Sequence, residues 1–354
     1  MSNFGLIDAA WGKPHDRLPA WIMRQAGRYL LEYQEIKKTH TFLDICRSPR
    51  LIADVTMQPV EIIGADAAII FSDILLPLEP LGIKIGFDDT GARIEPLIRS
   101  SKDVASLRAY NPEDKLKIVL EGITETRKRL NGRLPLIGFC GSPFTLLHYM
   151  VEGKGSGGGT EIKRFIHNNQ SAAKKTLDLL SDILGEYLKA QINAGANIIQ
   201  IFDSRGGILS PEDYQQFSLP YIQKTLRKCK TPNIPRIVFN PNCSPYLELL
   251  AGLDCEVIGI DWQTDIRHAF SKLEGKTIQG NLNPRLLLIS PAKLELEVIR
   301  LLNDVPDYDH YIFNLGHGIQ PTTPVDNARL VIDTVHSYNF KKKGKSKIDT
   351  TTTS

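Results

Sequence analysis

Short runs of apolar residues recur along the chain, and stretches with helical periodicity lie between them. Each run lacks the alternation of a half-exposed strand, which is typical of strands that are covered on both faces. There are eight such runs: Pro19–Arg24, Ala67–Asp73, Pro135–Gly141, Asn197–Asp203, Arg236–Asn240, Val257–Trp262, Thr277–Leu282 and Tyr311–Gly316. We therefore predict eight buried parallel strands.

A small polar residue followed by proline marks the predicted helix starts. The polar side chain can cap the free amides of the first turn, and proline fits the first helical position, where its missing N–H costs nothing. The pairs are Ser48-Pro49, Asn111-Pro112, Ser210-Pro211, Ser244-Pro245, Ser290-Pro291 and Thr323-Pro324. Helices and strands are therefore expected to alternate along the chain.

This alternation predicts the fold class. It favours an α/β protein built as a (β/α)₈ TIM barrel over an open doubly wound sheet, which is the structural alternative. We assign residues 1–340 to a single catalytic barrel domain. Residues 341–354 are basic, polar and low in complexity, so we expect a disordered tail there rather than a patch for an anionic partner.

Composition and charge narrow the class of protein. The chain is 42% hydrophobic and 23% charged, with a net charge of +3, which is too small by itself to indicate nucleic acid or membrane binding. No apolar run reaches the ~20 residues of a membrane helix, and no secretory signal is visible. The five cysteines include no CxxC pair, which suits a reducing cytosol. We expect a soluble cytoplasmic protein with no nucleic-acid or membrane partner.

Polar side chains follow every predicted strand. In a barrel of this class, reactive groups lie at the carboxyl ends of the strands and in the loops that follow. The residues found there are Arg24 and Arg28, Asp73, Tyr149, Asp203 with Ser204 and Arg205, Asn240, Asp261, Asn281, and Asn314 with His317. These positions define the candidate site.

Arg24 and Arg28 flank the segment Gln25-Ala26-Gly27 directly after the first predicted strand. Guanidinium groups bind carboxylates through paired, charge-assisted hydrogen bonds, so two of them at one barrel mouth suggest an anionic substrate. The alternative is a structural ion pair with an acid such as Glu32.

Asp73 ends an apolar run and has no basic neighbour in sequence. A carboxylate in such a setting is costly unless it is paired, and it is a candidate for catalysis. The alternative is an aspartate bound to backbone amides. His317 lies between two glycines that allow a ligand to approach closely, although a structural role is equally compatible. Ser204 lacks a serine-hydrolase triad, so we interpret it as a hydrogen-bonding group.

Several motifs argue against a metal or cofactor. The segment 153–158 fits GxGxxG but follows a helical stretch instead of a strand, so the dinucleotide-binding context is absent. We expect it to form a mobile loop over the site. No HxxxH or CxxC spacing suggests a metal site, and no lysine at a strand end suggests a Schiff base. We expect a site that works without metal or cofactor.

The chain resembles the uroporphyrinogen decarboxylase family over almost its whole length. The order of RQAGRYL, FSDIL and NLGHG is a specific signature. The matching segments are PAWIMRQAGRYL (Pro19–Leu30), DAAIIFSDIL (Asp66–Leu75), LIGFCGSPFTLLHYMVEG (Leu136–Gly153), IQIFDSRGGILSP (Ile199–Pro211), VIGIDW (Val257–Trp262), IQGNLNP (Ile278–Pro284) and FNLGHGI (Phe313–Ile319).

The resemblance implies a barrel homodimer that decarboxylates the four acetate side chains of uroporphyrinogen III to methyl groups, giving coproporphyrinogen III in haem biosynthesis. Asp73 would be the catalytic residue that stabilises the cationic pyrrole, and the arginines would hold carboxylates. By motif, the substrate-binding residues would be Arg24, Gln25, Ala26, Gly27, Arg28, Asp73, Tyr149, Ser204 and His317.

The chain departs from the family pattern at Leu31, which replaces a proline, at Arg205, where relatives often carry Trp or His, and in the segment 240–245. Two other functions compete with decarboxylation. A related barrel family transfers methyl groups with cobalamin and zinc, but Asn240, Cys243 and His317 make a poor tetrahedral zinc site. A non-catalytic tetrapyrrole binder would have no need of Asp73.

Overall fold

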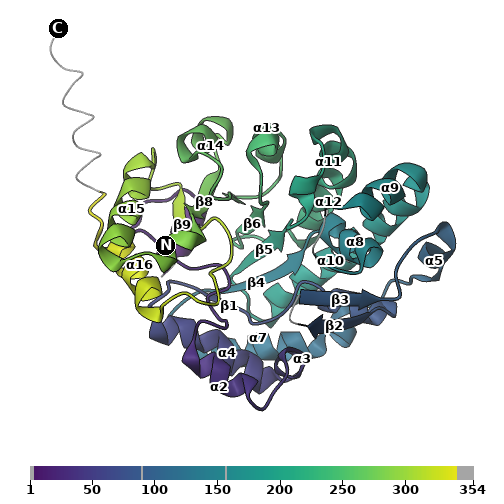
Figure 1. Cartoon of the computed structure of the whole chain (residues 1–354), viewed down its shortest axis with the longest axis horizontal. Helices are drawn as coiled ribbons and strands as arrows, with labels where there is room; N and C mark the ends of the chain where they lie inside the picture. The colour runs from purple at the N-terminus through teal and green to yellow at the C-terminus, as the bar shows by residue number, and fades with distance from the viewer. Residues whose placement is uncertain (1–3, 89–90, 156–157, 341–354) are drawn as a thin grey trace, which may run out of the picture.

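The computed structural model describes residues 4–88, 91–155 and 158–340 of the chain, so the predicted tail at 341–354 lies outside the described residues. A parallel sheet of seven strands forms the centre of the molecule, in the order β1-β4-β5-β6-β7-β8-β9 (Figure 1). The strands are β1 (Ala68–Ile69), β4 (Leu136–Gly141), β5 (Ile198–Phe202), β6 (Arg236–Phe239), β7 (Val257–Gly259), β8 (Thr277–Leu282) and β9 (Tyr311–Leu315).

Seven of the eight predicted strands are therefore confirmed, and every neighbouring pair is parallel. The first predicted run, Pro19–Arg24, contributes only an isolated parallel bridge between Ala20 and Phe313 of β9. The Phe313 N–H donates to the Pro19 carbonyl at 2.9 Å, and the Asp66 N–H donates to the Ala20 carbonyl at 2.8 Å. This run thus lies between the two edges of the sheet.

The sheet is curled. Gln279 on β8 donates from Nε2 to Oε1 of Gln200 on β5 at 3.2 Å, although β6 and β7 separate these strands in the sheet order. Trp21 donates from Nε1 to Oε1 of Gln279 at 2.9 Å. Side chains from distant strands meet in this way only if the sheet bends around a common interior. The coarse prediction of a barrel-like α/β fold is confirmed.

Helices surround the outer face of the curled sheet (Figure 1). They bury apolar faces against the strands or against neighbouring helices, as amphipathic helices do. Within the described residues they are α1 (Gly5–Ala10), α2 (Leu31–Lys37), α3 (Phe42–Cys46), α4 (Pro49–Ile62), α5 (Ser101–Ser106), α6 (Pro112–Lys115), α7 (Lys117–Leu130), α8 (Pro143–Glu152), α9 (Thr160–Asn168), α10 (Gln170–Ala194), α11 (Pro211–Phe217), α12 (Leu219–Cys229), α13 (Leu247–Ala251), α14 (Ile266–Lys272), α15 (Pro291–Asp304) and α16 (Val325–Ser337).

Most of the predicted helix starts are confirmed. Ser48, Asn111 and Ser210 accept a backbone N–H in the first turns of α4, α6 and α11, with proline at the next position. Ser290 precedes α15 but makes no side-chain cap hydrogen bond. These residues act locally, so the sequence alone was sufficient to locate them.

Two predicted helix starts differ in the structure. Ser244 begins a short 3₁₀ helix, η3 (Ser244–Tyr246), instead of an α-helix. Near Thr323, helix α16 begins at Val325, with Pro324 at the cap position. Further 3₁₀ turns follow other strands: η1 (Leu76–Leu81), η2 (Gly206–Ile208) and η4 (Pro284–Leu288).

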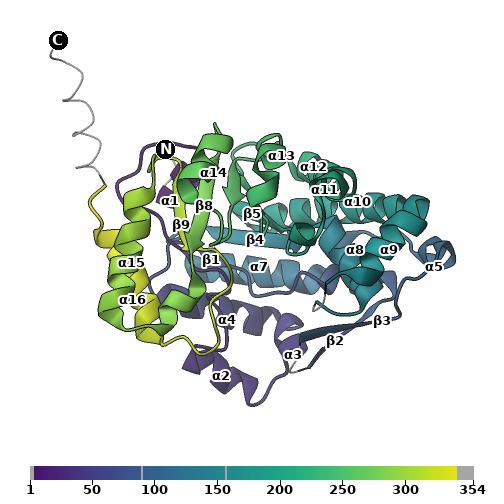
Figure 2. The same cartoon turned by 45° about the horizontal axis from the view of Figure 1, so that its top comes forward.

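An antiparallel hairpin of β2 (Lys84–Asp88) and β3 (Gly91–Glu95), which the strand count did not include, lies apart from the main sheet next to α3 (Figure 2). Its strands are mostly exposed. Phe87 of β2 contacts Phe42 of α3 edge-on at 4.6 Å between ring centroids. The hairpin therefore lies against the helix layer.

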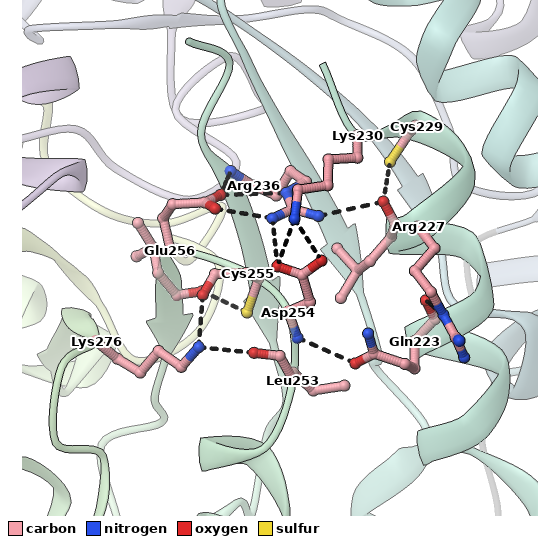
Figure 3. Close-up of polar contacts among 12 residues, drawn as sticks. Gln223, Arg227, Cys229, Lys230, Arg236, Leu253, Asp254, Cys255, Glu256 and Lys276 are labelled. Carbon is pink, nitrogen blue, oxygen red and sulfur yellow. Dashed lines mark hydrogen bonds and ion pairs between the residues drawn. The ribbon is translucent and has the colours of Figure 1, made fainter. Parts of the chain in front are cut away.

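Charged side chains form a network at the amino ends of β6, β7 and β8 (Figure 3). Arg236, the first residue of β6, has a side chain only 3% exposed and pairs with Glu256 at 2.8 Å and Asp254 at 3.0 Å. Lys230 also pairs with Asp254 at 2.9 Å, and Lys276 donates to the backbone carbonyl of Cys255 at 2.8 Å. This end of the sheet is opposite to the predicted site, so we assign the network to stability.

Within the described part of the chain, the structure contains no helix of the length and apolarity needed to span a membrane.

Candidate active site

Arg24 has a left-handed backbone conformation, with φ at 63°. Residues other than glycine adopt this conformation at an energetic cost, so their surroundings must hold it in place. The fully buried side chain of Gln25 helps to hold the Arg24 backbone in this conformation. Its Oε1 accepts from the Ile22 N–H at 3.1 Å, and its Nε2 donates to the carbonyl of Ala67, just before β1, at 2.9 Å.

The last strand fixes the same loop from the other side. The Met23 N–H donates to Oδ1 of Asn314 on β9 at 2.9 Å, and the Ile319 N–H donates to the Met23 carbonyl at 3.0 Å. A Cβ atom at Gly318 would lie 2.4 Å from Cδ of Arg24. The Arg24 side chain therefore packs directly on the backbone beside His317, which requires glycine there.

Asp73 lies in the loop between β1 and η1 and is half-buried. Its Oδ1 accepts from the Leu75 N–H at 2.8 Å. Burial raises the pKa of Asp73 to about 6, against the opposing effects of this hydrogen bond and of the Arg24 charge. The carboxyl group thus ionises near neutral pH, where small changes in its surroundings alter its charge.

Tyr149 of α8 brings a further cation close to these groups. Arg205 lies over its ring, with Cζ 5.9 Å from the ring centroid. Burial raises the pKa of Tyr149; the Arg205 charge and hydrogen bond oppose the rise, as does Arg24, while Asp73 adds to it. Tyr149 therefore lies within electrostatic range of Arg24, Asp73 and Arg205.

His317, in the loop after β9, belongs to the same cluster. Burial lowers its pKa, and the charges of Arg24 and Arg205 lower it further, whereas Asp261 acts in the opposite direction. Its ring contacts Trp262 edge-on, at 6.2 Å between centroids. These effects favour the neutral form of the His317 imidazole.

The remaining predicted site residues lie around this cluster. Arg28 is exposed, and its charge acts on Tyr33, whose ring contacts Phe71 at 5.6 Å. Ala26 and Gly27 are half-buried in the loop between the two arginines. Ser204 is half-buried and lies between Asp203 and Arg205, after β5. The structure thus brings Arg24, Asp73, Tyr149 and His317 together, whereas Gln25 directs its side chain into the scaffold.

Asp203 anchors the end of β5, a role that its position alone did not reveal. It is fully buried, and its carboxylate accepts from Ser142 Oγ at 2.5 Å, Asn240 Nδ2 at 3.0 Å and Ser218 Oγ at 3.2 Å. Burial raises its pKa, and these hydrogen bonds oppose the rise. The sequence did contain a signal for Ser142, one of the partners of Asp203. Ser142-Pro143 has the same Ser-Pro pattern as the predicted helix starts, and Ser142 caps α8.

The ends of β6 and β7 carry a separate buried group. Cys243 contacts Asp261 Oδ1 at 3.7 Å and Thr264 Oγ1 at 3.4 Å through Sγ, and burial raises the pKa of its thiol to about 12. All five cysteines are free and buried. The described residues include no group of three or more His, Cys, Asp or Glu side chains arranged to hold a metal ion.

Comparisons with known proteins agree with this geometry. A family model described as uroporphyrinogen decarboxylase (URO-D) matches residues 1–338. A uroporphyrinogen decarboxylase of Geobacter metallireducens is 46% identical over 340 residues, covering 96% of this chain and 100% of the relative. The enzyme of the same name from Geobacter sulfurreducens is 44% identical over the same shares.

Among solved structures, a methyltransferase from Methanosarcina mazei superposes with a TM-score of 0.80 at 19% identity, covering 94% of this chain and 97% of the other. At this identity the likeness concerns the fold alone. The family match, which covers residues 1–338, and the two sequence relatives, which cover 96% of the chain, are much stronger than this likeness. The chain therefore belongs to the uroporphyrinogen decarboxylase family.

Proposed function

We propose that this protein removes carbon dioxide from the four acetate side chains of uroporphyrinogen III and releases coproporphyrinogen III. The observation that carries the proposal is Asp73, a half-buried acid with a pKa of about 6 beside Arg24 and Tyr149. Family membership supports the same reaction.

The substrate supplies the electron sink. A proton added to a pyrrole ring carbon makes the ring cationic. The bond between the acetate methylene and its carboxylate then breaks, carbon dioxide leaves, and the bonding electrons neutralise the ring. A second proton enters at the methylene carbon to form a methyl group, and the ring loses its first proton. Each decarboxylation therefore consumes one proton in total and needs no oxidant or reductant.

Asp73 stabilises the cationic ring. When it is ionised, its carboxylate accepts hydrogen bonds from pyrrole N–H groups and opposes the positive charge that develops before carbon dioxide leaves. Such preorganised electrostatic stabilisation is a large term in enzyme catalysis. The raised pKa follows from burial, which also strengthens the interaction, since a charge in a poorly hydrated site is less screened.

The other residues bind and orient the substrate. Arg24 and Arg28 hold its carboxylates through paired hydrogen bonds. The neutral imidazole of His317 and the hydroxyls of Tyr149 and Ser204 supply further hydrogen bonds. Among the neighbouring loop residues, Gln25 acts through the backbone that it fixes, while Ala26 and Gly27 give the substrate close access to that backbone.

The architecture belongs to the same proposal. Residues 19–23 would complete the sheet as the eighth strand of a closed barrel, which is supported by their hydrogen bonds toward β9 and toward Asp66 before β1. Residues 4–340 would form a single catalytic domain that works as a cytoplasmic homodimer. The five free cysteines are compatible with a reducing compartment.

A zinc-dependent methyltransferase is a weaker explanation. Zinc sites of that kind need thiolate ligands, and Cys243, in the loop after β6, is buried with its thiol pKa raised to about 12. Bound zinc in the purified protein, measured by elemental analysis, would favour it. A protein that only binds tetrapyrroles would have no need of an acid such as Asp73, whose pKa is raised to about 6.

The test is anaerobic incubation of the purified protein with uroporphyrinogen III and no added cofactor. The products are then oxidised to porphyrins and separated by their number of carboxylates. We expect stepwise loss of the acetate carboxylates down to coproporphyrin. The Asp333→Asn variant, at an exposed position on α16, should behave as the parent does. Unchanged substrate after prolonged incubation would refute the proposal.

A further inference from the structure

Arg205 differs from the other arginines of the site because it is half-buried, whereas Arg24 and Arg28 are exposed, and no acidic side chain forms an ion pair with it within the described residues. It is half-buried at the end of β5, where its backbone N–H donates to Thr145 Oγ1 at 3.1 Å. Arg236, the buried arginine at the other end of the sheet, pairs with two carboxylates. Partial burial of an arginine without such a partner costs free energy, and a bound anionic ligand would offset this cost.

The guanidinium of Arg205 is held in a defined place. Tyr149 accepts a hydrogen bond from it, and its Cζ lies 5.9 Å from the tyrosine ring centroid. A Cβ atom at Gly155 would lie 2.9 Å from Nη2 of Arg205 and 2.3 Å from the Tyr149 hydroxyl oxygen. The backbone of Gly155 therefore closes over both groups and restricts their motion.

The Arg205 side chain also has unused donor capacity. Its Nε is buried and has no hydrogen-bond partner within the described residues. An unsatisfied buried donor is unfavourable. A carboxylate bound to the guanidinium would offset this cost, because the five N–H groups of arginine match the two oxygens of a carboxylate.

The neighbouring histidines do not contribute positive charge. His148 is fully buried, and burial together with the Arg205 charge lowers its pKa to about 4. The pKa of His317 is lowered by burial and by the charges of Arg24 and Arg205. The local positive potential therefore comes from the arginines, with Arg205 on the Tyr149 side and Arg24 on the Gly318 side.

We propose that Arg205 is a third carboxylate-binding residue, which holds a side-chain carboxylate of the substrate in a subsite formed with Tyr149 and the Gly155 backbone. The inference rests on the proposed function, since it concerns how that substrate is bound. The contacts of Arg205 within the described residues are with Tyr149, Gly155 and Thr145. We therefore assign it to substrate binding and not to the chemical step.

The test compares steady-state decarboxylation of uroporphyrinogen III by the parent and by Arg205→Gln, Arg205→Lys and Arg227→Gln. Arg227 is an exposed arginine on α12 and controls for the loss of one positive charge. We expect KM to rise about 10- to 100-fold in Arg205→Gln, as for the loss of a charge-assisted hydrogen-bonded pair. We expect kcat within about threefold of the parent, partial rescue by lysine and parental kinetics for Arg227→Gln.

Two further measurements separate a binding role from a structural one. The rise of KM with ionic strength should be shallower in Arg205→Gln than in the parent, because one attractive charge is missing. Gly155→Ala should also raise KM, because its methyl group displaces the Arg205 and Tyr149 side-chain tips. Thermal unfolding identifies any variant that fails to fold, in which case Gly155→Ala and Arg205→Lys still provide the test.

Unchanged KM and salt dependence in folded Arg205→Gln would overturn the inference, as would a loss of kcat at constant KM. Either result leaves the proposed function intact as long as the parent decarboxylates the substrate. A parent without activity would instead refute the proposed function.

Discussion

The positive charge of Arg24 lowers the pKa of Asp73 against the effect of burial, which raises it to about 6. The two residues follow chain segments that lie side by side, since the Ala20 carbonyl accepts from the N–H of Asp66 at 2.8 Å. Burial alone would keep more of the acid neutral. Under the proposed function, Arg24 would therefore have two effects: it would attract an anionic substrate, and it would maintain the charge on Asp73, which would face the cationic ring.

Asp73→Asn should lose most of its turnover and still bind substrate. The amide can accept the Leu75 N–H but cannot oppose the cationic pyrrole, so we expect kcat to fall about 100-fold or more, as when a major electrostatic contribution is removed. The measurement is single-turnover decarboxylation together with equilibrium binding of the product. Turnover at the parental rate would show that the assigned role is wrong.

The same substitution should stabilise the protein at alkaline pH. Below the ordinary pKa of 3.8, Asp73 is neutral in both the folded and the unfolded state. Above about 6, the folded state carries an unfavourably buried charge. The free energy of unfolding should therefore be higher in Asp73→Asn than in the parent by roughly 1 to 3 kcal/mol at pH 8, and equal to it at pH 3.5. Urea denaturation at both values checks the sign.

Arg24→Gln should shift the pH dependence of catalysis. In the proposed mechanism the ionised form of Asp73 is the active one, so kcat/KM of the parent should rise with pH through an apparent pKa of about 6. Without the arginine this midpoint should move to higher pH, in addition to a rise in KM. The Arg227→Gln variant should keep the parental midpoint. A midpoint that stays in place in Arg24→Gln would exclude the electrostatic coupling.

Asp203→Ala should destabilise the protein strongly. It leaves donors on Ser142, Ser218 and Asn240 without their acceptor in a buried region. We expect a loss of about 3 kcal/mol or more in the free energy of unfolding. Asp178→Ala, which removes only an exposed ion pair with Lys224, should change it by less than about 1 kcal/mol. Similar losses in both variants would argue against a buried network.

Arg236→Met should reduce stability without affecting catalysis, because the network lies at the amino ends of the strands. Removing one partner of a buried ion pair costs about 3–5 kcal/mol, and replacing both partners costs much less. The double variant Arg236→Met with Glu256→Leu should recover only part of the loss, because it removes the acceptor of the residue 236 backbone N–H, which lies 2.7 Å from Oε2 of Glu256, and leaves Asp254 without the guanidinium. Chemical denaturation measures both effects, and kcat/KM serves as the control.

The ion pairs of Asp254 with Arg236 and Lys230 should make the free energy of unfolding fall at low pH. Arg236 and Lys230 lower the pKa of Asp254 to about 2. Its contribution to stability is thus present above its ordinary pKa of 3.8 and disappears as the pH falls through about 2. In Arg236→Met this acid-dependent loss should be smaller. An unchanged pH profile would contradict the pairing.

The sequence by itself was sufficient for the features that depend on local physics. Strands covered on both faces need continuous apolar runs, and helix caps need a short polar side chain next to the first turn, so both could be predicted. The polar residues after each strand could also be identified, because the ends of parallel strands face the same side of the sheet. The hairpin at residues 84–95 and the start of α16 at Val325 were missed, since exposed strands and uncapped helix ends leave weak patterns.

Only the tertiary structure decided which of these polar residues meet. The curl of the sheet brings Asp73, Tyr149 and His317 within electrostatic range of Arg24 from elements that are far apart in the chain, and it turns Asp203 into a buried anchor. It also places Arg205 against Tyr149 without an acidic partner among the described residues, which its position in sequence could not indicate. The physical reason is range: helix capping and the apolar pattern of a strand are set by residues that are near one another in the sequence. The burial of a polar side chain and the coupling between charges depend on distances that exist only in the folded chain.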